Sequence, residues 1–124
     1  MIIHLHLVRH GQTFFNLYNR LQGWSNSPLT EAGLADADHA GSLLAGIDFA
    51  AAYCSDTTRA QTTAERILDA NEQAGHRRPA LVADMHFREQ FYGYYEGQDM
   101  SMAWLAAGGP HGAQTYQAIV SQYG

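Results

Sequence analysis

Residues 1–14 read MIIHLHLVRHGQTF, an apolar run over Ile2–Val8 that stops at Arg9, His10 and Gly11. An apolar run of this length that ends at a glycine is typical of a buried strand entering a turn. Open α/β sheets bind ligands at the carboxyl ends of their strands. Arginine has a planar charged fork suited to phosphate, histidine can act as a nucleophile, and glycine lets an anion approach the backbone. The stretch therefore predicts a phosphate site built around a reactive imidazole.

The composition limits the classes of protein to consider. The chain has 124 residues, 46% hydrophobic and 15% charged, which predicts one soluble domain over residues 1–124. No apolar window reaches the ~20 residues that a membrane span needs. The net charge is −5 and all seven basic side chains are arginines, so no nucleic acid partner is expected. A single cysteine and the lack of a basic leader predict a cytoplasmic location.

Apolar periodicity and turn residues predict helices and strands in alternation after this first strand. We expect a helix-like stretch at Thr13–Leu21, a helix from the N-cap Thr30 to about Ala45, a strand at Phe49–Cys54, a helix capped by Ser55 or Asp56 that runs to about Ala74, a strand at Leu81–Ala83, an aromatic loop at His86–Gly97, and helices at Asp99–Ala107 and Gln114–Tyr123. Such alternation predicts an α/β domain with parallel strands and right-handed crossovers.

This topology brings three polar groups to one edge of the predicted sheet. Arg9–His10, Ser55–Arg59 and His86–Glu89 each follow a predicted strand. Because the carboxyl ends of parallel strands share an edge, we expect two arginines, a histidine and a glutamate to meet there.

Four segments carry, in order, a resemblance to a known family: Leu7–Thr13 with Asn16 downstream, Gln22–Gly33, Ser55–Ala64 and Phe87–Gly97. They resemble the Arg-His-Gly opening motif, the QGW…PLTExG stretch, the S.L.RA.QTA segment and the L.E..FG.WEG segment of the histidine phosphatase superfamily, the phosphoglycerate mutase-like proteins. The resemblance extends from Ile2 to about Gly97. It implies a three-layer α/β/α fold with a mostly parallel sheet.

The resemblance also implies the chemistry of the site. His10 would attack phosphorus and form a phosphohistidine, which water then hydrolyses. Arg9 and Arg59 would hold the phosphoryl oxygens and offset the charge of the transferred group. Glu89 would protonate the leaving oxygen as general acid, a role for which Glu96 is the competing carboxylate.

Three further residues would complete the phosphate pocket, namely Asn16, Gln22 and Gly23. No metal and no other cofactor is expected, because the arginines supply the positive charge. The expected partner is a small phosphorylated substrate or inorganic phosphate.

One departure from the family pattern concerns its second catalytic histidine, which lies in a late His-Gly motif after another strand. His111 is the late candidate here, and it follows Gly108–Pro110 rather than an apolar strand. We interpret His111 as a loop histidine and expect the chain to lack the C-terminal part of the fold. Such a chain would be nearly inactive by itself, and its uncovered sheet edge would favour a homodimer or pairing with another chain.

The same residues allow other interpretations. His4 and His6 alternate along the first strand as metal ligands would in an amidohydrolase, but that class needs a barrel of ~250 residues, so we expect a buried, hydrogen-bonded pair. Cys54 and Arg59 are one residue too close for a cysteine phosphatase. A protein that only binds phosphate is the remaining non-enzymatic alternative.

Within the family, the choice is between a phosphatase and a mutase. Cofactor-dependent mutases carry ERHYGGLTGLNK after the acid, with an Asn-Lys pair that helps to hold a bisphosphate. Tyr94–Asp99 takes that place here, and the chain has no lysine. We therefore predict a phosphomonoester hydrolase, with phosphoglycerate mutase as the alternative.

Overall fold

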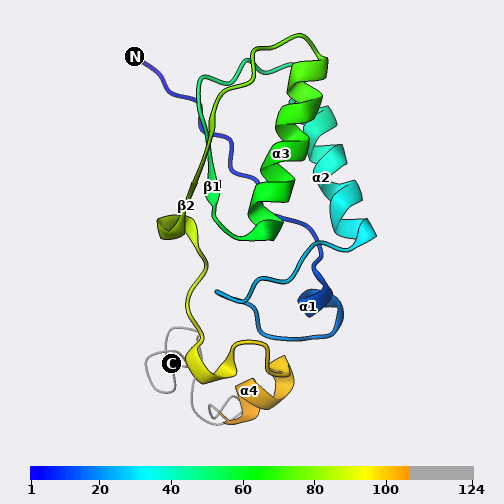
Figure 1. Ribbon diagram of the computed structural model, residues 1–124, viewed down its shortest axis with the longest axis vertical. Coiled ribbons are helices and arrows are strands. Elements are labelled where there is room, and N and C mark those ends of the chain that lie inside the picture. The colour runs from blue at the N-terminus through cyan, green and yellow to red at the C-terminus, as the bar shows by residue number, and fades with distance from the viewer. Residues whose placement is uncertain (107–124) are drawn as a thin grey trace.

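The computed structural model describes residues 1–106. Its elements, in chain order, are α1 (Phe14–Leu17), α2 (Glu31–Leu44), β1 (Ala52–Ser55), α3 (Thr58–Gln73), β2 (Leu81–Asp84), single 3-10 turns at Met85–Phe87 and Gly93–Tyr95, and α4 (Met100–Ala106) (Figure 1). The predicted helix at Gln114–Tyr123 and the predicted loop histidine His111 lie outside the described residues. None of the described helices is long and apolar enough to cross a membrane.

Helix α2 begins where the sequence predicts it. The Thr30 hydroxyl accepts a hydrogen bond from the Gly33 amide, and Glu31 lies in the first turn, where its charge favours the helix dipole. Buried Ala37 and Gly41 lie four residues apart and therefore on one face. A Cβ on Gly41 would lie 3.1 Å from the Cβ of Ala70, so this glycine allows α2 to pack closely against α3.

Helix α3 covers the strand pair. Its N-cap is Thr57, which lies two residues after Ser55 and one after Asp56, the two predicted caps. The Ser55 hydroxyl instead accepts a hydrogen bond from the Thr57 amide in the turn before the helix. Ile67 and Leu68 are buried on its inner face. The helix ends at Gln73 with Ala74 as its C-cap, and Gly75 follows with φ of 97°, the left-handed conformation that favours glycine after a helix.

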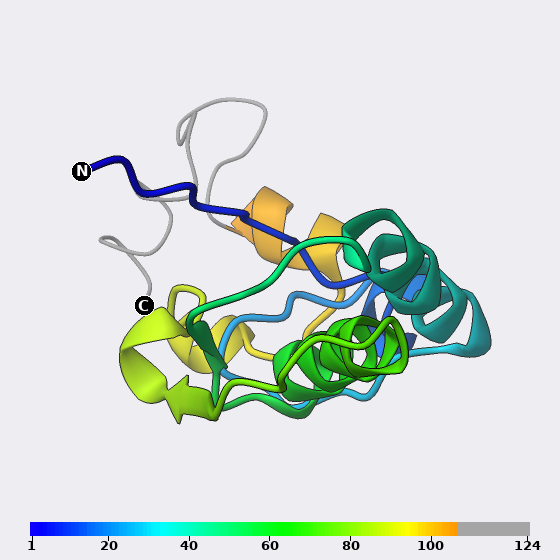
Figure 2. The ribbon, with the colours of Figure 1, turned by 90° about the horizontal axis from the view of Figure 1, so that it is seen from above.

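Strands β1 and β2 form a parallel pair, with Ala52 opposite Leu81 and Ser55 opposite Asp84. Both strands therefore end at the same edge. Helix α3 lies against this pair and α2 lies against α3, on the same side of the sheet (Figure 2). The α/β class and the parallel pairing are confirmed, and the described residues supply a helical layer on one side of the sheet.

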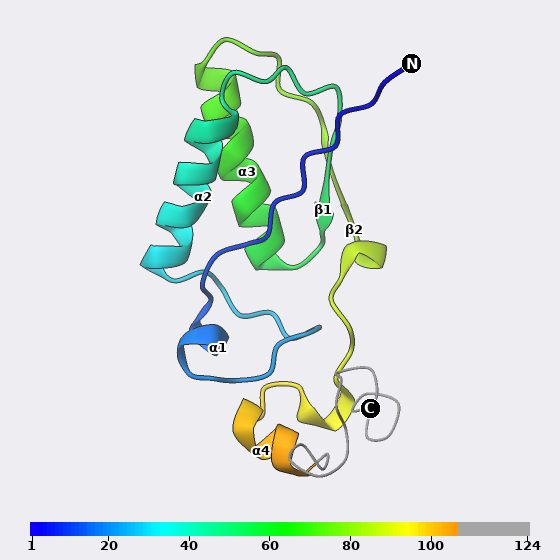
Figure 3. The same ribbon diagram turned by 180° about the vertical axis from the view of Figure 1, so that it is seen from behind.

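The predicted first strand is wrong. Residues 1–10 are extended but belong to no strand, and the side chains of Ile2, Leu5 and Leu7 are 82%, 76% and 86% exposed. Figure 3 shows this segment running the length of the helix and sheet unit before it reaches α1. An apolar run becomes a strand only when a neighbour accepts its backbone hydrogen bonds, and the sheet of the described residues consists of β1 and β2 alone.

The predicted buried histidine pair is wrong for the same reason. His4 and His6 belong to this unpaired segment, and both are exposed. The His6 ring contacts Phe49 edge-on, with ring centroids 5.6 Å apart. A segment that joins no sheet has no interior face in which to bury a histidine.

A hydrophobic cluster joins α4 to the loop after α1 and the segment after β2. Leu21, Tyr92 and Ala103 are buried together, with Tyr95 and Met100 packed against them. The backbone of Arg20 forms an antiparallel bridge with Asp99, which ties the loop after α1 to the start of α4. The described chain thus has two packed units, and the segments between them carry the polar residues predicted for the site.

Candidate functional site

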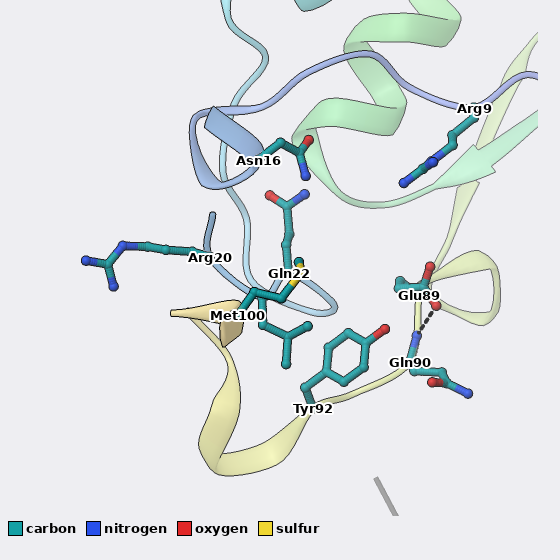
Figure 4. A pocket seen from close by; sticks show the side chains of 9 residues that line it. Arg9, Asn16, Arg20, Gln22, Glu89, Gln90, Tyr92 and Met100 are labelled. Atoms are coloured by element: carbon teal, nitrogen blue, oxygen red, sulfur yellow. Dashed lines mark hydrogen bonds between the residues drawn. The ribbon is translucent and has the colours of Figure 1, made fainter. Parts of the chain in front are cut away.

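A cavity of about 480 Å³ opens between the segment before α1, the loop after α1, the segment after β2 and the start of α4. Its lining residues are Arg9, Asn16, Arg20, Leu21, Gln22, Glu89, Gln90, Tyr92 and Met100 (Figure 4). Four of the predicted site residues are therefore brought together around one cavity. In Figure 4, Arg9 and Glu89 approach from one side, whereas the Arg20 side chain points away from the others.

His10 follows Arg9 and is half-buried. Its Nδ1 lies 2.7 Å from the carbonyl oxygen of Gly11. A carbonyl oxygen can only accept, so Nδ1 carries the hydrogen and Nε2 carries the lone pair. Burial is the largest effect on the pKa of His10 and lowers it, and the positive charges of Arg59 and Arg9 lower it further. The hydrogen bond to the Gly11 carbonyl and the Glu89 carboxylate act in the opposite direction and raise this pKa. The imidazole is therefore neutral at pH 7, which is the nucleophilic form.

Arg59 is fixed by backbone carbonyls. It lies in the first turn of α3, is 3% exposed, and donates to the carbonyl oxygens of Ser25 and Gly23, both at 2.7 Å. Burial lowers the pKa of Arg59, and the carboxylates of Glu96 and Glu89 raise it. An arginine nevertheless remains charged at neutral pH, so this cation contributes its full charge beside His10.

Glu89 is exposed at the cavity lining, after β2 and the turn that follows it. Its carboxylate accepts from the Gln90 amide at 2.8 Å, and its carbonyl accepts from Trp24 Nε1 at 3.0 Å. The preceding Arg88 donates two hydrogen bonds of 2.7 Å to Asp56, and these bonds hold the pKa of Asp56 below its usual value. This pair joins the segment after β2 to the segment after β1, which keeps Glu89 near Arg59.

Asn16 and Gln22 are oriented by Thr13, which is fully buried. The Asn16 Oδ1 accepts from the Thr13 amide at 2.9 Å, and the Thr13 hydroxyl lies 3.2 Å from Gln22 Oε1. Both side-chain oxygens thus face Thr13. The side-chain NH₂ groups are donors, and both residues line the cavity, so the arrangement suits an anion.

Three of the predicted site residues, His10, Gly23 and Arg59, are not among the residues that line this cavity, and Gly23 packs beside it. Its amide donates to Glu96 Oε2 at 3.2 Å, and the residue is buried beside the cavity rather than lining it. A Cβ at this position would lie 1.9 Å from the Gln90 carbonyl oxygen. The glycine is needed because the loop packs directly against the backbone of the segment after β2.

Sequence reasoning did not identify three apolar residues of the cavity lining, namely Leu21, Tyr92 and Met100. Isolated apolar residues in loops have the same pattern as core residues, and Leu21 and Tyr92 are in fact core residues as well. Glu96, the carboxylate that competes with Glu89 in the sequence, lies among several backbone amides and does not line the cavity.

Comparisons with known proteins identify relatives of this chain. The profile of the histidine phosphatase superfamily (branch 1) matches residues 5–110. The 2,3-bisphosphoglycerate-dependent phosphoglycerate mutase 2 of Gloeobacter violaceus is 42% identical over 91 residues, which cover 73% of this chain and 40% of that protein.

Solved structures share the fold. The phosphoglycerate mutase of Bacillus anthracis str. Sterne matches with a TM-score of 0.74 at 35% identity, over 90% of this chain and 48% of that one. The mycobacterial glucosyl-3-phosphoglycerate phosphatase, solved with VO3, matches with a TM-score of 0.70 at 27% identity, over 81% and 45%. The chain thus spans less than half the length of these relatives. The family profile covers most of the chain, and this chain therefore belongs to the histidine phosphatase superfamily, branch 1.

Proposed function

We propose that this protein hydrolyses phosphomonoesters through a phosphohistidine at His10. The observation that carries the proposal is the state of this side chain. Its Nδ1 is held by the Gly11 carbonyl, its pKa is lowered by burial, and the charges of Arg59, Arg9 and Glu89 all act on it. A neutral imidazole between two arginines and a carboxyl group suits attack on phosphorus.

The proposed reaction has two steps, phosphoryl transfer to His10 and hydrolysis of the phosphohistidine. In the first, His10 Nε2 forms a bond to phosphorus while the ester P–O bond breaks, and Glu89 gives a proton to the departing oxygen. In the second, water attacks phosphorus, Glu89 takes its proton, and the N–P bond breaks to release inorganic phosphate. Arg9 and Arg59 stabilise the phosphoryl charge in both steps. Asn16 and Gln22 contribute the amide donors that face the cavity.

The floor of the cavity supports hydrolysis over phosphoglycerate isomerisation. Leu21, Tyr92 and Met100 give it an apolar surface. A mutase cofactor or substrate with a second anionic group would need a second cation beside this surface. Arg20 also lines the cavity, but its side chain points away from the other lining residues. We therefore favour monoesters whose organic part is uncharged and partly apolar.

Phosphoglycerate mutase is the second candidate. The observation in its favour is the 42% identity to a protein named as a 2,3-bisphosphoglycerate-dependent mutase. Production of 2-phosphoglycerate from 3-phosphoglycerate that depends on added 2,3-bisphosphoglycerate would establish it in place of the hydrolase.

A screen of phosphomonoesters tests the proposed function. We expect release of inorganic phosphate from p-nitrophenyl phosphate or naphthyl phosphate, a loss of at least about a thousandfold in His10→Ala, and no change in His39→Ala, whose histidine is exposed on α2. Equal release by wild type and His10→Ala would contradict the proposal. Binding of orthovanadate without turnover would instead support a protein that only binds phosphate.

A further inference from the structure

Glu96 lies at the centre of a hydrogen-bond cluster outside the cavity. Its Oε1 accepts from the amides of Trp24 at 2.7 Å and Tyr92 at 3.2 Å. Its Oε2 accepts from the amides of Gly23 at 3.2 Å and Ser25 at 3.0 Å, and from the Ser25 hydroxyl. Successive backbone N–H groups form a concavity that favours an anion, and here the protein's own carboxylate fills it.

The opposite side of this loop faces a cation. Residues 23–25, which we call the 23–25 loop, direct their amides to Glu96 and the carbonyls of Gly23 and Ser25 to Arg59. Both hydrogen bonds from Arg59 to these carbonyl oxygens are 2.7 Å long. The peptide units of the loop therefore lie between a half-buried carboxylate and a buried guanidinium. Their N–H groups point to the negative charge and their carbonyl groups to the positive charge, so both charges favour the same orientation of the peptide units.

The loop has little room to adjust by itself. A Cβ on Gly23 would lie 1.9 Å from the Gln90 carbonyl and 2.7 Å from Tyr92 Cδ2, so its backbone lies directly against the segment that carries Glu96. Trp24 Nε1 donates to the Glu89 carbonyl at 3.0 Å, which fastens the same loop to the predicted general acid. Loss of the carboxylate would leave three neighbouring amides without their acceptor and free the loop to turn.

We propose that Glu96 is a positioning residue of the phosphate site, which fixes the Arg59 guanidinium through the 23–25 loop. Arginine has five N–H donors; the two carbonyls take one from each terminal nitrogen, and the proposed function directs the others to phosphoryl oxygens. The two carbonyl groups fix the direction in which those donors point. Glu96 fixes the orientation of the two carbonyl groups, because it accepts hydrogen bonds from the amides of the same loop. The inference rests on the proposed function only where it takes Arg59 as a phosphate ligand.

The test compares Glu96→Gln and Glu96→Asp with the wild type. Glutamine loses the charge and presents an NH₂ donor to amides that need an acceptor, and aspartate is one methylene too short to reach all of them. Glu72→Gln is the matched control, since Glu72 is exposed and pairs with Arg78 on the surface. The readouts are amide hydrogen exchange of residues 23–25, the NMR signal of the Arg59 Nε–H, the Kd for orthovanadate, and kcat and KM.

We expect Glu96→Gln to speed exchange in the 23–25 loop, move the Arg59 Nε–H signal and weaken vanadate binding roughly ten- to a hundredfold, as a misplacement of about 1 Å does at such sites. Glu96→Asp should show an intermediate effect on all three, and Glu72→Gln none. If Glu96→Gln does not fold, Glu96→Asp and Ser25→Ala, which removes one of the bonds, carry the same test.

An unchanged Arg59 signal and unchanged vanadate affinity, in a folded variant whose loop exchanges faster, would overturn the inference and leave Glu96 a stabilising residue only. A wild type that neither binds vanadate nor hydrolyses monoesters would contradict the proposed function instead. In that case the Arg59 signal in the free protein still decides whether Glu96 positions the guanidinium.

Discussion

The Nδ1 of His10 lies 2.7 Å from the Gly11 carbonyl oxygen, and this contact selects the tautomer of the ring. With the hydrogen held on Nδ1, the lone pair resides on Nε2 in the resting protein. In the proposed reaction, no tautomer exchange is then needed before attack on phosphorus, and the Gly11 carbonyl group orients the proposed nucleophile.

The first prediction concerns the pH dependence of activity. Because burial and two arginines lower the pKa of His10 from 6.5, the neutral nucleophile persists below that pH. Activity should be present above the lowered pKa and lost as the pH falls through it. The acid limb of kcat/KM for p-nitrophenyl phosphate should therefore lie below pH 6.5.

The matched variants for this profile are Arg9→Gln and Arg77→Gln. Arg9 is one of the cations that lower the pKa of His10, so its removal should move the acid limb to higher pH, whereas Arg77 is exposed and should have no effect. An acid limb above pH 6.5 in the wild type, or one insensitive to Arg9, would argue against His10 as the titrating group.

The second prediction concerns the fork of Arg59. Lysine keeps the charge but cannot donate in parallel to the Gly23 and Ser25 carbonyls. We expect Arg59→Lys to lower kcat/KM by roughly a hundredfold or more, the cost of one preorganised donor. Arg66→Lys, which changes a surface pair with Asp38, should retain full activity. Full activity in Arg59→Lys would mean that charge alone suffices.

The third prediction concerns Gly23. A methyl group here would overlap the Gln90 carbonyl oxygen, so Gly23→Ala should lower the free energy of unfolding by about 1–3 kcal/mol. Gly46→Ala is the control, because a Cβ there meets nothing within 4 Å. Urea denaturation monitored by tryptophan fluorescence measures both. Equal midpoints for the two variants would show that the 23–25 loop is not held against the segment after β2.

The fourth prediction concerns Met100, one of the apolar residues that line the cavity. The wild type should form little 2-phosphoglycerate from 3-phosphoglycerate with added 2,3-bisphosphoglycerate. Met100→Lys should lower KM for 3-phosphoglycerate by about tenfold relative to p-nitrophenyl phosphate, since one good charged contact contributes roughly 1.5 kcal/mol. Met102→Lys is the control, because Met102 is on the same helix but 65% exposed. An identical shift in both variants would indicate a general charge effect.

The elements that the sequence predicts well are those with local signals. Thr30 marks the start of α2, and Gly75 marks the end of α3, because a cap and a left-handed residue act within a few positions of the helix end. Strands β1 and β2 are predictable for a similar reason, since each is a short apolar run between turns. The segment before Arg9 has an equally apolar pattern, but a strand also needs a partner, which local sequence does not report.

The candidate site also has features that the sequence predicts and features that it does not. Arg9 and Glu89 were placed together by topology, and they line one cavity although the first strand is not formed. The bonds of Arg59 to backbone carbonyls could not be foreseen, since side-chain patterns contain no information on where carbonyls point. Glu96 meets Gly23 across 73 positions of sequence, and only the folded chain brings them into contact.

Isolation of the phosphoenzyme tests the central claim most directly. After incubation with a ³²P-labelled phosphomonoester and rapid denaturation, the wild-type chain should carry a label that is lost in acid and stable in base, as a phosphoramidate is. The label should be absent in His10→Ala and present in His39→Ala. A label that is lost in base is not a phosphoramidate, and a label that persists in His10→Ala does not lie on His10, so either result would contradict the account.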